Sequence, residues 1–287
     1  MLELPLPRIG GPDIPAQLNI RRANLHRSLT KAAETLGVHI RCATTVETWT
    51  NDDDAIRVTF SDTSSQDYAL MVGADGVSSA QRKQLMPETK PEFCKAVVWR
   101  AKTPRPTGLD ATHVYIGSQK SVAGPVLLDD ETAYMYLGEA SDDASYRDEE
   151  TLHLQLRDRL GVFGGYIAQL APHIDAAEKV LCRRIGKMLL PAPWHRSRIV
   201  LIGDAAYVYS PSLSQGACMG NEDAIVLAEE VARNPDDIAQ ALEGFQNRRF
   251  DRVKAVADAS TELETAKNQR ELTRIRKGIL EFLAEPI

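Results

Sequence analysis

The hydrophobic pattern of the first third of the chain predicts one helix followed by strands. Residues 22–36 place apolar side chains at helical spacing, and Gly37 follows as a stop signal. Beyond it, short apolar runs alternate with polar turns, which is typical of strands. The expected strands are 38–42, 55–60 and 68–72, of which the last runs into Gly73-Ala74-Asp75-Gly76, and a helix through Ser79, Arg82 and Leu85 is expected next.

The middle of the chain has a different pattern. Between about Phe93 and Glu139, short aromatic and β-branched runs are separated by Pro, Gly and Asp, so a mostly antiparallel sheet is expected. Its strands are expected at 96–101, 113–116, 122–128 and 133–138. A helical segment should follow at about 148–170, and then a strand near 180–185.

The last third returns to the first pattern. The run 198–202 predicts a buried strand that ends in Gly203-Asp204, and residues 215–233 predict a long helix with further helices after it. The order α/β, then β-rich, then α/β indicates a nucleotide-binding domain with a second domain inserted in it. The expected bounds are 1–90 and 191–240 for the discontinuous domain, 91–190 for the inserted domain and 241–287 for C-terminal helices.

Composition narrows the classes of function. The 287 residues carry a net charge of −6 without a basic stripe, so nucleic acid is not an expected partner. The four cysteines never form a CxxC pair and the six histidines show no metal-ligand spacing, so we expect no metal and a reducing cytoplasm. No apolar run approaches the ~20 residues that span a bilayer, and residues 1–15 do not resemble a signal peptide.

The first candidate motif follows the strand at 68–72. An aspartate beside a glycine at a strand end puts a carboxylate at the sheet edge where α/β proteins bind ligands, and Gly76 permits close approach of a ligand or backbone. The alternative interpretation is a strand-to-helix turn in which Asp75 caps the helix. Ser79 and Arg82, at their spacings, favour the first interpretation.

The second candidate motif is the string Gly203-Asp204-Ala205-Ala206, continued by Pro211, Gln215-Gly216-Ala217 and Glu222-Asp223-Ala224. At a strand end, Asp204 could accept hydrogen bonds from a polyol. Gly216 opens a helix whose free amides could face an anionic ring or oxygen. The alternative makes Asp204 a turn residue and Gly216 only a helix entry.

These two strings resemble the DG and GD motifs of the class A FAD-dependent aromatic monooxygenases, the family of para-hydroxybenzoate hydroxylase and salicylate hydroxylase. The helix that opens with Arg21-Arg22-Ala23-Asn24 resembles that family's arginine-containing helix, and the likeness extends from about Arg21 to Arg252. The resemblance implies an α/β fold: a Rossmann-like FAD-binding domain of the glutathione-reductase type, an inserted antiparallel substrate domain and C-terminal helices. It also implies that NAD(P)H reduces the flavin and that a flavin hydroperoxide hydroxylates a small aromatic substrate.

The resemblance assigns cofactor-binding roles residue by residue. It implies that Gly203-Asp204 holds the ribityl hydroxyls, that Pro211 and the amides of Gly216, Ala217 and Cys218 lie beside the isoalloxazine, and that Asp75 and Gly76 serve the pyrophosphate and the nicotinamide donor. Arg22 and Val46 would contact the adenine nucleotide half, although a solvated helix arginine and a strand-core valine are open alternatives. No catalytic acid or base is assigned, since the cofactor carries the chemistry.

Other positions have structural interpretations or open roles. Tyr207 stands where many relatives have histidine, and its role is open. Arg248, Arg249 and Arg252 are expected on a solvated helical face, with a partner-binding role as the alternative. Among Trp99, Tyr115, Tyr134 and Tyr136, those that face inward from the sheet are mostly expected in its core, with a substrate contact as the alternative.

The family's N-terminal GxGxxG unit is not found in this sequence; Gly10-Gly11 lies between prolines and does not match it. The FAD-binding domain is therefore expected to be incomplete, with an exposed sheet edge that favours self-association or a further segment as partner. Two hypotheses follow: an FAD-dependent monooxygenase, or a non-enzymatic remnant that binds a small ligand or a partner chain.

Overall fold

The computed structural model describes residues 8, 11–52, 54–117, 121–142, 148–175, 179–266 and 268–287, so Gly10 lies outside the described residues. The chain divides into two compact units. The first unit consists of Met1–Ile40 and Lys95–Ile185, and the second of Arg41–Cys94 and Gly186–Ile287. The division into FAD-binding and substrate domains stays a prediction.

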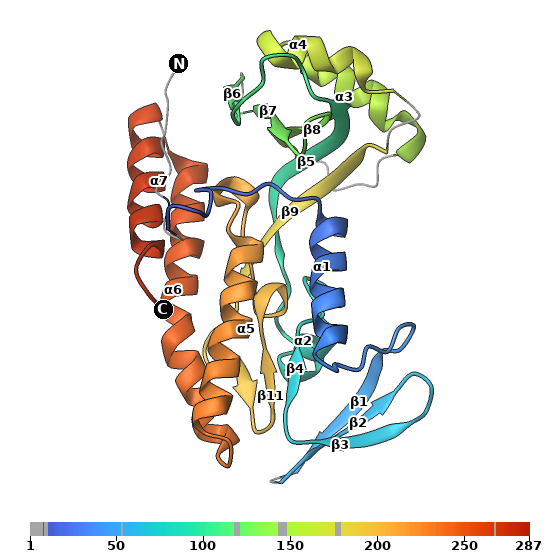
Figure 1. The fold of residues 1–287 in the computed structure, drawn as a ribbon, viewed down its shortest axis with the longest axis vertical. Helices are drawn as coiled ribbons and strands as arrows, with labels where there is room; N and C mark the ends of the chain where they lie inside the picture. Colours follow the sequence, from blue (N-terminus) through green and yellow to red (C-terminus); the bar gives the residue numbers. More distant parts are fainter. Residues whose placement is uncertain are drawn as a thin grey trace. The chain divides into compact units, whose positions relative to one another are not determined.

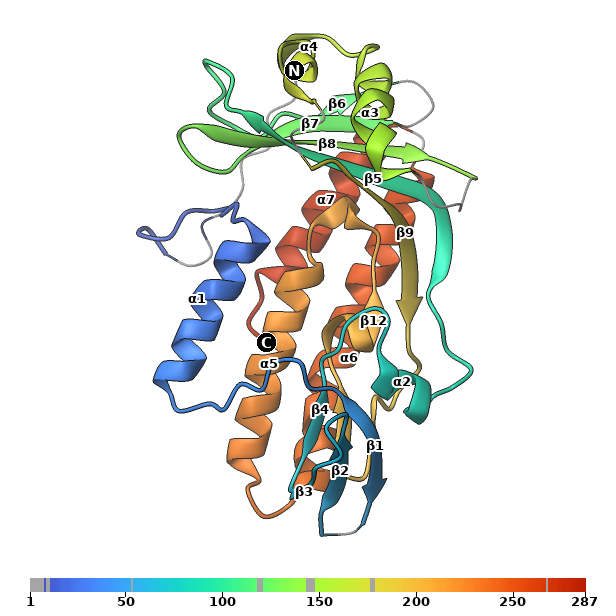
Figure 2. The same ribbon diagram turned by 90° about the vertical axis from the view of Figure 1, so that its right-hand side faces the viewer.

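The first unit contains the antiparallel sheet expected in the middle of the chain. Its strands pair in the order β5 (Glu92–Pro104), β8 (Thr132–Ala140), β7 (Val122–Leu127) and β6 (Tyr115–Ile116). Alternate residues of β5 and β8, among them Trp99 and Met135, are fully buried. They share a core with α3 (Leu152–Leu160) and α4 (Gly165–Leu170), which lie together on one face of the sheet in Figure 2. The predicted helical segment is thus two helices, preceded by the turn η2 (Glu149–Thr151) and followed by η3 (Ala171–His173).

Helix α1 (Arg22–Thr35) also belongs to the first unit. It forms as predicted, and Gly37 adopts a φ of +79°, a value that favours glycine after a helix end. None of its residues is buried, and Leu29 and Leu36 are 55% and 83% exposed. Its apolar stripe therefore contributes little to the core of the unit.

The second unit begins with the sheet β1 (Val46–Asn51), β2 (Ile56–Phe60) and β3 (Ser65–Tyr68), all antiparallel. The strand expected at 38–42 was wrong, because β2 pairs instead with β1 and β3, which satisfy its backbone groups on both sides. The strand expected at 68–72 is also wrong in its extent. It is interrupted at residues 69 and 70, so Tyr68 ends β3 and Met71 begins β4 (Met71–Gly73).

A second small sheet in this unit has the order β10 (His195–Arg196), β11 (Ile199–Leu201) and β4. β11 runs parallel to β4 and antiparallel to β10, so β4 is an edge strand among the described residues. The end of β9 (Leu181–Leu189) pairs with β12 (Tyr207–Val208) through Met188 and Leu189.

Helices complete the second unit. The short α2 (Ala80–Leu85) follows β4, and α5 (Gly216–Arg233), α6 (Ile238–Thr265) and α7 (Gln269–Leu283) lie side by side in Figure 1. The turns η4 (Gly203–Ala205) and η5 (Pro211–Leu213) link β11 to α5. The core joins β11 to the inner faces of α5 and α6, with Trp194 and Phe245 fully buried.

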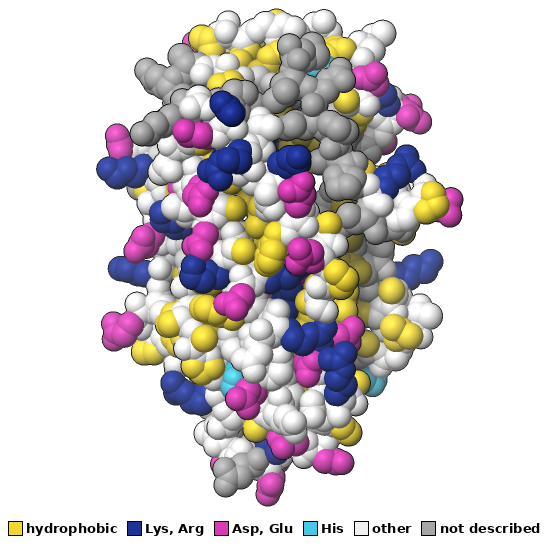
Figure 3. Space-filling model, turned by 90° about the vertical axis from the view of Figure 1, so that its left-hand side faces the viewer, with side chains coloured by type: hydrophobic (Ala, Val, Ile, Leu, Met, Phe, Trp, Pro, Cys, Tyr) yellow, Lys and Arg dark blue, Asp and Glu magenta, His cyan; other side chains and the backbone are white. Residues whose placement is uncertain are grey.

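The described surface is mixed in charge. On the face drawn in Figure 3, Lys and Arg side chains are interspersed with Asp and Glu, so neither sign forms a continuous patch there. Among the described helices, none is long and apolar enough to cross a membrane.

Candidate cofactor site

The two motif loops leave the same edge of one sheet. Leu201 of β11 lies opposite Gly73 of β4 in parallel register, and the N–H of Ile202 donates to the carbonyl of Gly73 at 3.1 Å. A Cβ at Gly73 would lie 2.7 Å from the Leu201 side chain, so any larger residue would displace that buried side chain. The carboxyl ends of neighbouring parallel strands are where open α/β sheets bind ligands.

In the first loop, residues 74–79, Asp75 is bound to the following helix. Its Oδ2 accepts hydrogen bonds from the N–H groups of Ala80 at 2.7 Å and Gln81 at 3.2 Å. The Ser79 hydroxyl also accepts from the N–H of Arg82, at 2.9 Å. Asp75 therefore makes the capping interaction that was the structural alternative, and its assigned role towards a cofactor stays a prediction. Gly76 has a φ of +80° with nothing within 4 Å of an added Cβ.

Arg82 connects the two loops. Its guanidinium is 1% exposed and donates to the carbonyl of Val77 at 2.6 Å and to the carbonyl of Ala205 at 3.1 Å. Burial lowers the pKa of Arg82, an effect that the carboxylate of Asp75 opposes. Because one side chain bonds both loops, their separation depends on it.

The second loop, residues 202–206, is held in a different way. Gly203 has a φ of +55°, and an added Cβ would lie 3.7 Å from Cα of Gly220 in α5. The N–H of Gly203 donates to Oδ2 of Asp223, also in α5, at 2.8 Å. Asp204, the next residue, is exposed. The loop is thus fastened through its glycine, while the carboxylate that the resemblance assigns to a polyol lies at the surface.

Asp223 is the centre of a buried polar network. It is 0% exposed and also accepts hydrogen bonds from the Tyr207 hydroxyl at 2.5 Å and from Nε of Arg249 at 2.7 Å. Burial raises the pKa of Asp223, and the hydrogen bonds from Tyr207 and Arg249 oppose that rise. Burial beside Asp223 also raises the pKa of Tyr207, so this phenol stays protonated.

The network corrects one prediction and settles an open question. Arg249 is 0% and Arg252 8% exposed, and both donate to Glu222, so the expectation of a solvated face was wrong for these two residues. The reason is tertiary, because α6 packs against α5 and places its arginines beside the acidic pair 222–223. Tyr207 faces Asp223 inside the unit and acts as a structural donor.

The start of α5 offers unsatisfied donors. The N–H groups of Gly216, Ala217 and Cys218 have no acceptor among the described residues, and Gln215 forms no side-chain cap. Nothing lies within 4 Å of an added Cβ at Gly216. Desolvation, together with the charge of Glu222, raises the pKa of Cys218, so its thiol stays neutral. These features fit an anionic, planar group placed at the helix N-terminus.

The predicted site residues fall into two sets. The larger set lies within the second unit and comprises Val46, Asp75, Gly76, Gly203, Asp204, Pro211 and residues 216–218. Of these, Val46 begins β1 and is half-buried against the core. Arg22 is exposed at the start of α1 in the first unit. The sequence did not reveal that Arg82 and Asp223 hold the two loops in place through hydrogen bonds, although both residues lie inside the motif strings.

Comparisons with known proteins identify the family of the chain. A family model described as "FAD binding domain" matches residues 14–260. YetM of Bacillus subtilis, whose name marks it as a candidate FAD-dependent monooxygenase, is 30% identical over 87% of this chain and 68% of its own length. The 2-heptyl-3-hydroxy-4(1H)-quinolone synthase of Pseudomonas aeruginosa is 30% identical over 85% of this chain and 63% of its own.

A solved structure has the same fold. HpxO of Klebsiella pneumoniae, crystallised with FAD and uric acid, superposes with a TM-score of 0.80 at 24% identity, over 92% of this chain and 72% of its own. An α/β unit with two motif loops at one sheet edge and a helix N-terminus beside them is typical of nucleotide-binding folds. The chain belongs to the FAD-binding family of FAD-dependent monooxygenases, and it spans about two thirds of the length of the curated relatives it matches.

Proposed function

We propose that the protein is an NAD(P)H-consuming, FAD-dependent monooxygenase that hydroxylates a small aromatic substrate. The observation that carries the proposal is the surface carboxylate of Asp204 in the same unit as the uncapped N-terminus of α5. The former suits the hydroxyls of a ribityl chain, and the latter suits the negative charge of a reduced isoalloxazine. The family membership of the chain supports the same cofactor.

The protein's own residues would bind and orient. Asp204 would accept hydrogen bonds from the ribityl hydroxyls, while the amides of residues 216–218 would donate to the ring. Gly76 leaves room for a close approach, and Pro211, which begins η5, would lie beside the ring. When bound, FAD supplies the redox chemistry, taking a hydride from NAD(P)H and activating oxygen. In the same proposal, Asp75 would serve the pyrophosphate and the nicotinamide donor, and Val46 and Arg22 would contact the adenine nucleotide half of FAD.

The substrate class follows from relatives. The names of relatives include a quinolone synthase and a 6-hydroxynicotinate 3-monooxygenase, and HpxO was crystallised with uric acid, so we infer a small planar aromatic or heteroaromatic compound. A reducing cytoplasm fits the four cysteines, none of which forms a disulfide in the described part of the chain. The edge strand β4 fits self-association or pairing with a further segment.

Titration of the purified chain with FAD, followed by its visible absorption, tests the cofactor. Saturable binding that is weakened in Asp204→Ala supports the proposal. NADH and NADPH oxidation with a panel of phenols and hydroxypyridines, and product analysis for one added oxygen, then tests the reaction. Saturable FAD binding without any substrate-dependent oxidation would favour the non-enzymatic alternative, and no FAD binding would overturn the cofactor assignment for this chain.

A further inference from the structure

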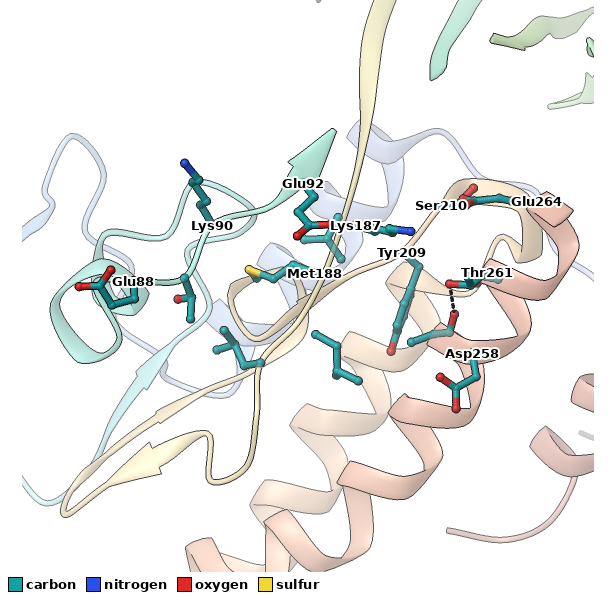
Figure 4. A pocket seen from close by; sticks show the side chains of 16 residues that line it. Glu88, Lys90, Glu92, Lys187, Met188, Tyr209, Ser210, Asp258, Thr261 and Glu264 are labelled. Atoms are coloured by element: carbon teal, nitrogen blue, oxygen red, sulfur yellow. Dashed lines mark hydrogen bonds between the residues drawn. The ribbon is translucent and has the colours of Figure 1, made fainter. Parts of the chain in front are cut away.

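The segment that follows the second loop adjoins a pocket. Tyr209 and Ser210 line a cavity of about 500 Å³ together with residues of α6, the end of β9 and the segment that leads from α2 into β5 (Figure 4). Its charged lining residues are Glu88, Lys90, Glu92, Lys187, Asp258 and Glu264. This mixture of both charges favours no single class of ligand. The charged residues of α5 and α6, in contrast, form an ordered cluster that leads back to the loop.

The end of α7 is bound by one side chain of α6. Arg252, which is 8% exposed, donates from Nη2 to the carbonyl of Leu283 at 2.8 Å. Its Nη1 donates to the carbonyls of Phe282 and Glu285, at 3.3 Å each. The guanidinium carbon also lies 5.7 Å from the centroid of the Phe282 ring. Because the carbonyls at the end of a helix lack an acceptor's usual partner four residues on, Arg252 supplies donors that α7 does not contain.

The same guanidinium binds a carboxylate of α5. Nε and Nη2 of Arg252 donate to Oε2 and Oε1 of Glu222 at 2.9 and 3.2 Å, a two-point contact. Oε2 of Glu222 also accepts from Nη1 of Arg249 at 2.7 Å. Arg249 donates from Nε to Oδ1 of Asp223, whose Oδ2 accepts the N–H of Gly203. Hydrogen bonds therefore run without a gap from the carbonyls of α7 to the backbone of the second loop.

Two arginines and two carboxylates share this cluster. While Arg252 holds Glu222 at two points, the fully buried Arg249 is available to Asp223. Without Arg252, Arg249 is the one charged donor left to Glu222 among the described residues, so a single guanidinium serves both carboxylates. An under-paired carboxylate is costly in such a mostly buried place, so Arg249 shifts towards Glu222 and its bond to Asp223 weakens. Asp223 then holds the N–H of Gly203 less firmly.

We propose that Arg252 is a positioning residue for the cofactor loop, and that it couples docking of the end of α7 to the backbone at Gly203. When the last turn of α7 is docked, Arg252 is fixed, the cluster keeps its pairing and Gly203 stays bonded to Asp223. When that turn is released, the loop 202–206 loosens. The coupling between α7 and the loop is a property of the chain alone, and only its consequence for FAD affinity rests on the proposed function.

Hydrogen–deuterium exchange of the full chain without FAD, followed by mass spectrometry of peptides from residues 202–206, tests the coupling. We expect Arg252→Met and Phe282→Ala each to speed exchange in this loop about fivefold or more, because the N–H of Gly203 loses part of its protection. Peptides of β2, which lies in the same unit, report opening of the whole unit and should exchange at an unchanged rate. The matched control is Lys277→Met at an exposed position of α7, which should leave the loop unchanged.

A double variant tests whether the two positions act through one chain of contacts. Once Arg252→Met is present, adding Phe282→Ala should speed exchange of the loop by less than about twofold. Unchanged loop exchange in Arg252→Met, equal acceleration of the loop and β2, or multiplied effects in the double variant would each overturn the proposal. If Arg252→Met does not fold, Arg252→Lys takes its place, since it keeps the charge but lacks the planar fork, and a smaller acceleration is expected. Unchanged loop exchange in that variant overturns the proposal equally.

FAD titration of the same variants separates this proposal from the proposed function. We expect Phe282→Ala to weaken FAD binding about threefold or more while Lys277→Met leaves it unchanged, because a loosened loop is less often in its binding conformation. Faster loop exchange with unchanged FAD affinity would overturn the positioning role of Arg252. No FAD binding by the unaltered chain would overturn the proposed function, whereas the exchange rates still decide whether α7 and the loop are coupled.

Discussion

The loops that follow β4 and β11 have similar sequences, but different carboxylates hold them in place. Each follows one of two paired parallel strands, contains a glycine with positive φ and carries an aspartate beside it. In the first loop, Asp75 fastens the turn itself by accepting two N–H groups of α2. In the second, Asp204 lies at the surface and the fastening is done by Asp223 of α5, which accepts the N–H of Gly203.

The two loops also differ in how far along the chain their support lies. Asp75 bonds groups five and six residues away, so its structural role is local. The support for the second loop comes from 20 residues away and lies fully inside the unit. With this remote, buried support, the adjacent Asp204 lies at the surface. Substitutions can separate the structural roles of these aspartates from the binding role proposed for Asp204.

The largest effect is expected for Asp223→Ala. It removes the acceptor of Gly203, Tyr207 and Arg249 together and leaves a buried guanidinium with a reduced set of partners, which costs about 3–5 kcal/mol. Urea unfolding followed by circular dichroism measures the loss. Glu229→Ala on the same helix, whose ion pairs are partly exposed, is the control and should cost about 1 kcal/mol or less. An equal loss of unfolding free energy in Asp223→Ala and Glu229→Ala would contradict the prediction that the buried network contributes more than the exposed ion pairs.

Asp204→Ala should separate binding from stability. We expect FAD affinity to fall about tenfold to a hundredfold, which corresponds to about 1.5–3 kcal/mol for charge-assisted hydrogen bonds. The free energy of unfolding without FAD should change by about 0.5 kcal/mol or less, because the side chain lies at the surface. FAD titration and urea unfolding of the same preparation check both. A destabilised variant with unchanged FAD affinity would assign Asp204 a structural role instead.

Arg82→Met tests whether the loops depend on each other. The substitution leaves the carbonyls of Val77 and Ala205 without their buried donor, and we expect a loss of about 1–3 kcal/mol in the free energy of unfolding. FAD affinity should fall as well, because the guanidinium sets the separation of the loops. Lys83→Met, which alters an exposed neighbour on α2, is the matched control. Unchanged unfolding and unchanged FAD binding in Arg82→Met would show that the bridge is dispensable.

A smaller effect is expected at Asp75. Asp75→Ala removes a helix-capping carboxylate and should lower the free energy of unfolding by about 1 kcal/mol, and Asp75→Ser should restore part of it. If Asp75 also contacts the dinucleotide, Asp75→Ser should restore stability without restoring FAD affinity. Parallel recovery of both quantities would assign Asp75 to capping alone.

The smallest effect near neutral pH comes from the tyrosine pair behind the second loop. Burial raises the pKa of both Tyr207 and Tyr209 above the ordinary value of 10.0, so the unfolded chain releases these protons first as pH rises. Their contribution is therefore fully present below about pH 9 and is lost above pH 10, by up to about 1.4 kcal/mol per residue for each pH unit. Urea unfolding from pH 8 to 11 measures the slope, which Tyr209→Phe should reduce. A slope that Tyr209→Phe does not alter would contradict the assignment.

Local patterns predicted most of the elements. Helix α1, α5 and the strands of the antiparallel sheet came from apolar periodicity, since each period reflects the geometry of its own backbone. The strand expected at 38–42 failed because an apolar run becomes a strand only where a partner satisfies its backbone. Residues 46–51, with a less apolar pattern, formed that partner for β2.

The sequence by itself determined the order of the two motifs, the glycines of their turns and the family to which they belong. Only the tertiary structure decided the separate roles of the acidic residues, since Asp75 caps a helix, Asp223 is buried with Arg249 and Asp204 lies at the surface. It also decided that Tyr207 and Arg249 are internal and that charges from residues 92, 187 and 264 share one pocket. The physical reason is that burial and pairing depend on groups brought together from distant positions, whereas turn and helix preferences depend on neighbours in the chain.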